Sequence, residues 1–165
     1  MTTILRALRS LALTFWIGGI AFFALAVAPV AFHVLPTAHQ AGLIVSSTIR
    51  ILHWIGLIAA PLILLTTLLL RTKSGAQSRA SLVALLLTLG MLALTAWSQF
   101  GILPRMEHDR QQAGGAIEQA DLNNPARLDF DRLHHLSEQV EGAVLLGGLV
   151  LIVLSAAEPA TPRSL

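Results

Sequence analysis

Four polar residues near the end of the chain, His134, Ser137, Glu138 and Glu141, have types and a spacing that could support ligand chemistry. Counted from His134 they recur at i, i+3, i+4 and i+7, which places them on one face of a helix. Imidazole is the commonest protein ligand of transition metals and a frequent ligand of haem iron, and carboxylates complete many metal sites. The pattern therefore indicates a candidate site for haem or a transition metal.

A second polar group, Arg50 and His53, lies at the start of a long apolar run and shares one helix face by the same kind of spacing. Ionisable side chains within apolar membrane helices are costly and usually face a bundle interior or water. If the two faces meet, each helix offers an imidazole to one ligand. The candidate cofactor-binding residues are then His53, His134 and Ser137, and the candidate metal ligands are His53, His134, Glu138, Glu141, Glu107 and His108.

A purely structural role is the alternative for these residues. Arg50 could form an ion pair with Glu138 or Glu141, and hydrogen bonds could satisfy the histidines. The chain has no dedicated ligand motif such as HExxH, so the spacing names no particular metal. No Ser-His-Asp arrangement can be derived either, so no catalytic residue is predicted and binding is favoured over enzymatic activity.

The elements that must position these side chains are long apolar helices. Hydrophobic residues make up 55% of the chain and charged residues only 12%, whereas a typical soluble domain has about 25% charged residues. A helix that spans a membrane needs about 20 apolar residues. The sequence predicts an all-α fold, an integral membrane four-helix bundle that forms a single domain over residues 1–165, with helices at about 10–33, 48–70, 80–104 and 125–157.

A polar hairpin is predicted at residues 105–133, between the third and fourth helices. Asn124 followed by Pro125 is typical of a helix start, with Asn as the N-cap and Pro in the first turn. From there no helix breaker occurs until Pro159, so a continuous helix would be about 50 Å long, longer than a hydrocarbon core of about 30 Å. We therefore expect the third and fourth helices to extend beyond the membrane on the outer side.

The distribution of charge predicts the orientation of the chain. One side carries six of the eleven basic residues but little acid, so its net charge is positive, and we expect it to be cytoplasmic together with both termini. The opposite side carries eight acidic residues and all six histidines. The basic residues expected in the cytoplasm are Arg6, Arg9, Arg71, Lys73, Arg79 and Arg163.

Composition excludes several kinds of chemistry and gives no support for one class of partner. The absence of cysteine excludes disulfides, thiolate metal sites and cysteine nucleophiles. A net charge of only +2 gives no indication of nucleic-acid binding. The expected partners are the lipid bilayer and either a larger membrane complex or further copies of this chain.

The start of the fourth helix resembles a motif in a family of small membrane proteins. Phe130, Leu133, His134 and Ser137 fit the pattern F-x-x-L-H-x-x-S-x-x-x-N, although Glu141 stands where the pattern has Asn. The family is the bacterial "domain of unknown function 4149" family, which is akin to eukaryotic transmembrane protein 205. Further segments that resemble it, in order along the chain, are Trp16–Gly19, Ala28–Pro29, Phe32 and Leu103–Glu107.

The resemblance implies a four-helix protein of the bacterial inner membrane but little chemistry. The association of the eukaryotic relative with resistance to platinum drugs suggests metal handling. The copper-resistance D membrane proteins and the bacterial membrane protoporphyrinogen oxidase are more remotely similar. The oxidase is expected to have a histidine in its first helix, but no histidine precedes Trp16 here. The lysine expected of the oxidase is also missing, because Lys73 is the only lysine.

The predicted function is that of a non-enzymatic, metal- or haem-handling module with a histidine- and carboxylate-rich periplasmic end. The first alternative is an accessory or structural subunit of a larger respiratory or photosynthetic membrane complex. The second alternative is a haem-linked redox enzyme.

Overall fold

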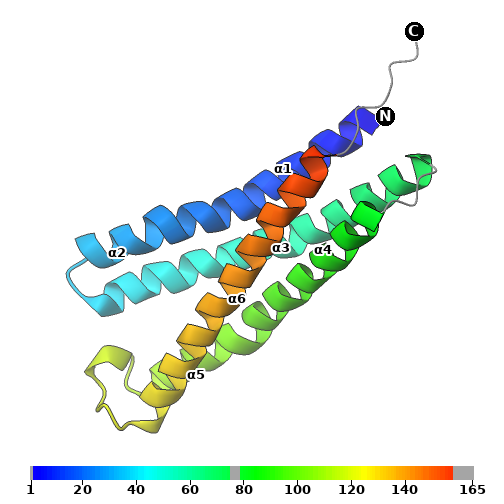
Figure 1. Ribbon diagram of the computed structural model, residues 1–165. Helices are drawn as coiled ribbons and strands as arrows, with labels where there is room; N and C mark the ends of the chain where they lie inside the picture. Colours follow the sequence, from blue (N-terminus) through cyan, green and yellow to red (C-terminus); the bar gives the residue numbers. More distant parts are fainter. Residues whose placement is uncertain (1, 75–78, 158–165) are drawn as a thin grey trace.

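Helices account for almost all of the computed structural model, which describes residues 2–74 and 79–157 (Figure 1). Within these ranges no strand occurs. Four stretches are long and apolar enough to cross a membrane: 2–34, 38–72, 79–112 and 125–156. The elements are α1 (Thr2–Phe22), η1 (Phe23–Val27), α2 (Ala28–Val34), α3 (Ala38–Ser74), α4 (Arg79–Trp97), η2 (Ser98–Ile102), α5 (Leu103–Gln112), η3 (Ile117–Gln119) and α6 (Pro125–Ala156).

The four stretches form a helical bundle. α1 packs against α3 and α6, and α4 packs against the same two helices, so each long helix has two neighbours. The first turn of α1 and the last turn of α6 lie at one end of the bundle, which we call the terminal end (Figure 1). The opposite end, formed by residues 33–39 and 105–133, is called the polar end. The predicted all-α membrane four-helix bundle is confirmed.

The helices also run beyond the apolar spans. α1 begins at Thr2 and α3 begins at Ala38. The side chain of Thr37, just before α3, accepts a hydrogen bond from the backbone N–H of Gln40 at 3.2 Å. Before α6, the helix start predicted at Asn124 and Pro125 is confirmed. The side chain of Asn124 accepts a hydrogen bond from the backbone N–H of Ala126 at 2.9 Å, and Pro125 occupies the first turn of α6. The third and fourth helices therefore extend past the apolar spans at the polar end, as α5 and the first turns of α6.

Two short π-helical segments interrupt membrane-spanning helices, and a proline follows each of them. η1 precedes Pro29 and η2 precedes Pro104. Proline has no N–H to give to the carbonyl four residues earlier, and its ring crowds that carbonyl. A π turn accommodates the conflict by adding a residue to the turn, and such turns occur frequently at functional sites. Both segments lie in the half of the bundle nearer the polar end.

The half of the bundle nearer the terminal end is closely packed. Trp16 and Ile17 of α1 are almost completely buried, and Met91 of α4 joins them in one apolar cluster. Glycines make this approach possible, because a Cβ on Gly56 would overlap the indole of Trp16 and one on Gly148 would overlap Ile17. Small residues at helix crossings are the usual device for close packing in membranes.

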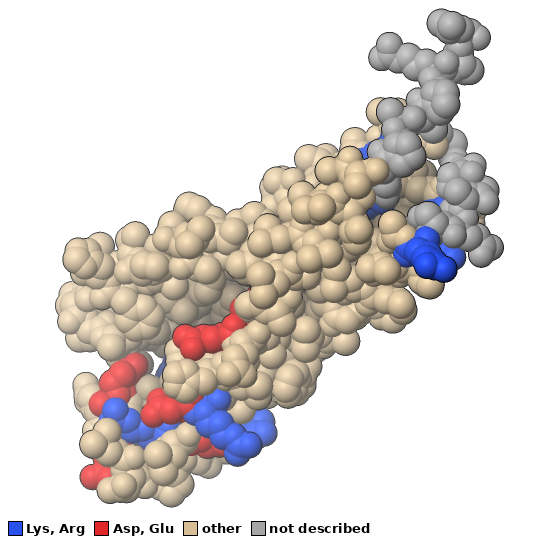
Figure 2. Space-filling view, viewed as in Figure 1, with Lys and Arg blue, Asp and Glu red and all other residues tan. Residues whose placement is uncertain are grey.

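At the polar end, polar side chains join the helices, in contrast to the close apolar packing nearer the terminal end. Arg105 pairs with Asp129 at 3.1 Å and so joins α5 to α6. Gly114 and Gly115 both have positive φ, which lets the chain turn after α5. All six histidines lie in the half nearer the polar end, and the acidic side chains in view gather there (Figure 2).

Candidate functional site

A buried polar cluster joins three elements inside the bundle. His53 of α3 is only 2% exposed. Its Nε2 lies 2.5 Å from Oε1 of Glu141 on α6, and its Nδ1 lies 3.0 Å from Oε1 of Gln99 in η2. Glu141 is 16% exposed, so only the carboxylate side of the cluster reaches a surface. The imidazole thus bridges a buried amide and a partly accessible carboxylate.

The direction of each hydrogen bond depends on the tautomer of His53. In the tautomer that carries its proton on Nδ1, His53 donates to the amide oxygen of Gln99. Its Nε2 then faces Oε1 of Glu141. The cluster therefore gives both ionisable side chains a polar partner in the apolar interior.

Gln99 lies within η2. In the π turn Ser98–Ile102 both Ser98 and Gln99 are buried. A polar residue in an apolar span, shortly before Pro104, is the signal by which the sequence could have identified Gln99.

Glu141 also lines a cleft of about 590 Å³ that opens near the polar end. One wall is apolar and consists of residues from α1, η1 and α2, among them Ile20, Phe23 and Phe32. The facing wall is a stripe along α6. Its members are Phe130, Asp131, His134, Ser137, Glu138, Glu141, Gly142 and Leu145.

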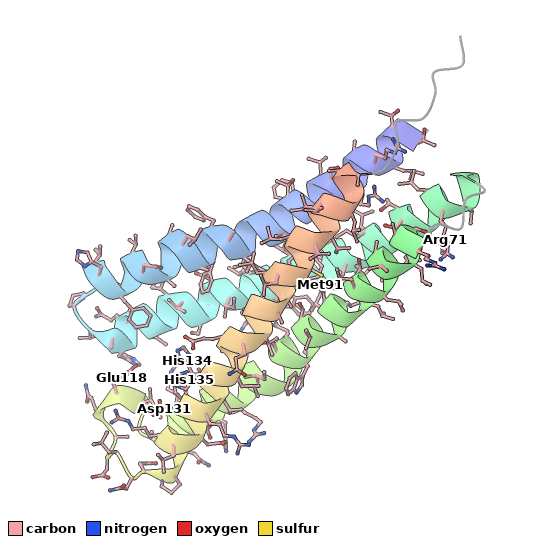
Figure 3. The ribbon with its side chains drawn as sticks, in the orientation of Figure 1. Arg71, Met91, Glu118, Asp131, His134 and His135 are labelled. Carbon is pink, nitrogen blue, oxygen red and sulfur yellow. The ribbon has the colours of Figure 1, made fainter. Side chains whose placement is uncertain are left out.

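The stripe contains the residues that were predicted to share one helix face. His134, Ser137, Glu138 and Glu141 all line the cleft. The hydroxyl of Ser137 donates to the backbone carbonyl of His134 at 2.8 Å, so it is already engaged within its own helix. Figure 3 shows His134 and Asp131 at the same end of the bundle as Glu118, far from Arg71. That these residues bind a cofactor remains a prediction.

The aromatic ring of Phe130 links two charged or ionisable side chains of the cleft. The ring of His134 stacks on it at 6.3 Å with an interplanar angle of 10°. The guanidinium of Arg110 lies 5.5 Å from its centroid. This stack holds the two polar side chains against the apolar body of the wall.

The expected ion pair of Arg50 with Glu138 or Glu141 is not among the contacts of residues 2–74 and 79–157. Glu141 pairs with His53, and Glu138 lies 3.3 Å from both His134 and His135. Arg50 is exposed, whereas His53, one turn further along α3, is buried. The rotation of α3 directs the imidazole inward and the guanidinium outward.

The remaining predicted ligands, Glu107 and His108, lie on α5 and do not line the cleft. Glu107 accepts hydrogen bonds from Arg110 and Gln111, each at 3.1 Å. His108 is exposed, and its Nε2 lies 2.9 Å from the amide nitrogen of Gln112. Both residues therefore contact their own helix.

The described part of the chain contains no group of three or more His, Asp and Glu side chains that could hold a metal ion. Both ring nitrogens of His53 are occupied by Gln99 and Glu141, so a metal there would have to replace a hydrogen bond. His134, in contrast, lines the cleft and is half-buried. Among the predicted cofactor ligands, it is the imidazole best placed to meet a bound molecule.

Four charged residues of the cleft were not predicted from the sequence: Asp131, Glu118, Arg110 and Arg127. They come from α5, from the turn η3 and from the first turns of α6. Their charges are common in a polar hairpin, and nothing in their spacing distinguishes them. Only the folding of this hairpin beside α3 brings them to the cleft.

Comparison with known proteins identifies a family. A protein-family model described as "Domain of unknown function (DUF4149)" matches residues 11–114, from α1 to the end of α5. No curated protein and no solved structure matches the chain. The match includes the segments Trp16–Gly19, Ala28–Pro29 and Leu103–Glu107, whereas the motif at the start of α6 lies beyond it. The match covers more than half of the chain, which therefore belongs to the DUF4149 family.

Proposed function

We propose that this membrane protein is a binding module that holds an amphipathic organic molecule in the cleft between α2, α3 and α6. The observation that carries the proposal is the pairing of two unlike walls, an apolar one on η1 and α2 and a polar stripe on α6. Sites for small molecules are mostly apolar, with a few placed polar groups, and have volumes of about 300–1,000 Å³. The cleft, at about 590 Å³, has this size and this composition.

The chain is proposed to form one domain in the bacterial inner membrane, with both termini in the cytoplasm. The basic residues at the terminal end, including Arg6, Arg9 and Arg71, support this orientation through the positive-inside rule. The cleft would then open in the periplasmic half of the bilayer. A molecule could enter it from the membrane or from the periplasm.

Haem is the second candidate ligand. The position of His134 on the cleft wall favours it, because a half-buried imidazole could supply an axial ligand to iron. Handling of a free metal ion, a role as an accessory subunit and a haem-linked redox activity rest on the sequence alone.

The proposal is tested by what the purified protein carries. Gly142 lines the cleft, and a Cβ there would meet no atom within 4 Å, so Gly142→Phe fills the cleft from inside. Gly90→Phe is the matched control, because Gly90 has the same open surroundings on the exposed face of α4. Each protein is purified in nanodiscs and extracted with organic solvent, and the extract is analysed by mass spectrometry.

We expect one organic compound, near one molecule per chain, from the wild type and from Gly90→Phe but not from Gly142→Phe. Equal extracts of ordinary phospholipid from all three proteins would overturn the proposal. A haem absorption band that is lost with His134→Ala would select the second candidate.

A further inference from the structure

The cleft has an excess of negative charge. Its lining contains four carboxylates and two guanidinium groups. Acidic atoms also border the hollow in the surface between the α2–α3 tip and α6 (Figure 2). The four acidic residues are Glu118, Asp131, Glu138 and Glu141, and the two basic residues are Arg110 and Arg127.

Both arginines are already bound to groups of the protein. Arg110 pairs with Glu107 at 3.1 Å, outside the cleft lining, and its guanidinium lies over the ring of Phe130. Arg127 donates to the backbone carbonyl of Ala120 at 2.6 Å and to that of Glu118 at 3.3 Å. The two guanidinium groups thus hold the polar end together and offer little to an anion.

Three of the carboxylates form no ion pair with a side chain of fixed positive charge. Among residues 2–74 and 79–157, neither Glu118, Asp131 nor Glu138 forms an ion pair with Arg or Lys. Glu118 lies 4.0 Å from His39, and Glu138 contacts His134 and His135. The excess of negative charge therefore does not depend on Glu141, whose carboxylate contacts His53.

The polar and apolar parts of the cleft follow one another along α6. Asp131 and Glu138 stand nearer the polar end, and Leu145 marks the opposite limit of the lining. The distance from Asp131 to Leu145 along the helix is about 21 Å. The other wall adds apolar and aromatic side chains, among them Phe23 and Phe32, and aromatic faces attract cations.

We infer that the ligand of the cleft is a lipophilic cation, with its charge near Asp131 and Glu138 and its apolar body between η1 and the deeper part of α6. The inference rests on the proposed function of this cleft and specifies its ligand class. A cation gains from the uncompensated carboxylates, whereas an anion of the same shape is repelled. The apolar wall replaces the lipid around the rest of the molecule.

Two probes of nearly identical size and shape isolate the effect of charge: tetraphenylphosphonium, a cation, and tetraphenylborate, an anion. Their binding is measured by equilibrium dialysis against protein in nanodiscs, and binding to empty nanodiscs is subtracted. We expect the wild type to bind the cation about tenfold or more tightly than the anion, which corresponds to about 1.4 kcal/mol. Equal binding of the two probes, or tighter binding of the anion, would overturn the inference.

A double variant and its matched control locate the effect. Asp131→Asn with Glu138→Gln removes two negative charges from the cleft. Asp121→Asn with Asp129→Asn removes two charges from the same polar end outside the cleft lining. We expect the preference for the cation to fall to less than about threefold in the first double variant and to stay at the wild-type value in the second. An equal loss in both would show a general surface effect and would overturn the inference.

Failure of the inference can be distinguished from failure of the proposed function. If Gly142→Phe abolishes the binding of both probes, and the wild type binds both equally, the cleft binds ligands without selecting cations. If neither probe binds above the empty-nanodisc level and no compound co-purifies with the wild type, both proposals fail.

Discussion

Two glycines of α6, only six residues apart, have opposite surroundings. A Cβ on Gly148 would overlap Ile17 of α1, whereas a Cβ on Gly142 would meet nothing within 4 Å. Gly148 belongs to the close packing of the half nearer the terminal end, and Gly142 borders the cleft. The same residue type thus permits helix contact in one half of the bundle and leaves space in the other.

The difference between the halves lies in the helix that faces α6. Nearer the terminal end this neighbour is α1, with the large buried side chains of Trp16 and Ile17. Nearer the polar end the facing chain is η1 and α2, where Ala24 and Ala28 line the cleft. Ala24 and Ala28 on one wall and Gly142 on the other leave a volume unfilled, and the histidines occur in this half. The bundle therefore combines a closely packed half with an open half that contains the polar chemistry.

The largest loss of stability is expected for Gly148→Leu. The new side chain would have to displace Ile17, which is almost completely buried, and overpacking of this kind costs about 3 kcal/mol. The free energy of unfolding is measured by titration with SDS and followed by circular dichroism. Gly142→Leu is the matched control on the same helix, and a comparable loss in that variant would contradict the contrast between the two halves.

A smaller loss is expected for His53→Leu. Removal of the imidazole leaves the buried amide of Gln99 and one oxygen of Glu141 without their partner, which costs about 2 kcal/mol. The same titration is used, with His135→Leu as control because His135 is 75% exposed. If both substitutions change stability equally, the buried cluster does not stabilise the bundle.

Gly142→Ala is expected to have a small effect of opposite sign. Alanine is a better helix former than glycine, and the methyl group enters open space, so stability rises by about 0.5–1 kcal/mol. Gly56→Ala provides the contrast, because its methyl group would overlap the indole of Trp16 and stability falls. Thermal unfolding followed by tryptophan fluorescence measures both. A loss in Gly142→Ala would show that the cleft is filled by the protein itself.

The smallest effect is expected at the surface of the polar end. Asp129→Asn removes an exposed ion pair with Arg105 and should change stability by less than about 0.5 kcal/mol. SDS titration at low and high salt measures the change, which should shrink as salt is added. A loss above about 1 kcal/mol would contradict the expectation that this exposed pair contributes little to the contact between α5 and α6.

The sequence was sufficient to predict the helices and one face of α6. Backbone polar groups must be satisfied within the segment when the chain crosses lipid, so long apolar runs become helices almost regardless of context. The spacing of His134, Ser137, Glu138 and Glu141 likewise placed them on one face, and they line one cleft.

The partner of Glu141 could not be predicted in this way. Arg50 and His53 are three residues apart, so both lie near the same face of α3 and either could meet α6. A modest rotation of the helix decides between them, and that rotation depends on contacts such as the one between Gly56 and Trp16. Gln99 escaped prediction because a single polar residue in an apolar span does not show which neighbouring helix it will face.

Composition and hydropathy alone determined that this chain is helical and multi-pass. A long apolar segment in lipid must satisfy its backbone hydrogen bonds internally, and a helix does so. Tertiary structure alone decided that His53 bridges Gln99 and Glu141, and that a cleft opens beside Gly142 but closes at Gly148. The physical reason is that both outcomes depend on the rotation and separation of whole helices. These are set by many weak packing contacts together, and no single residue or spacing encodes them.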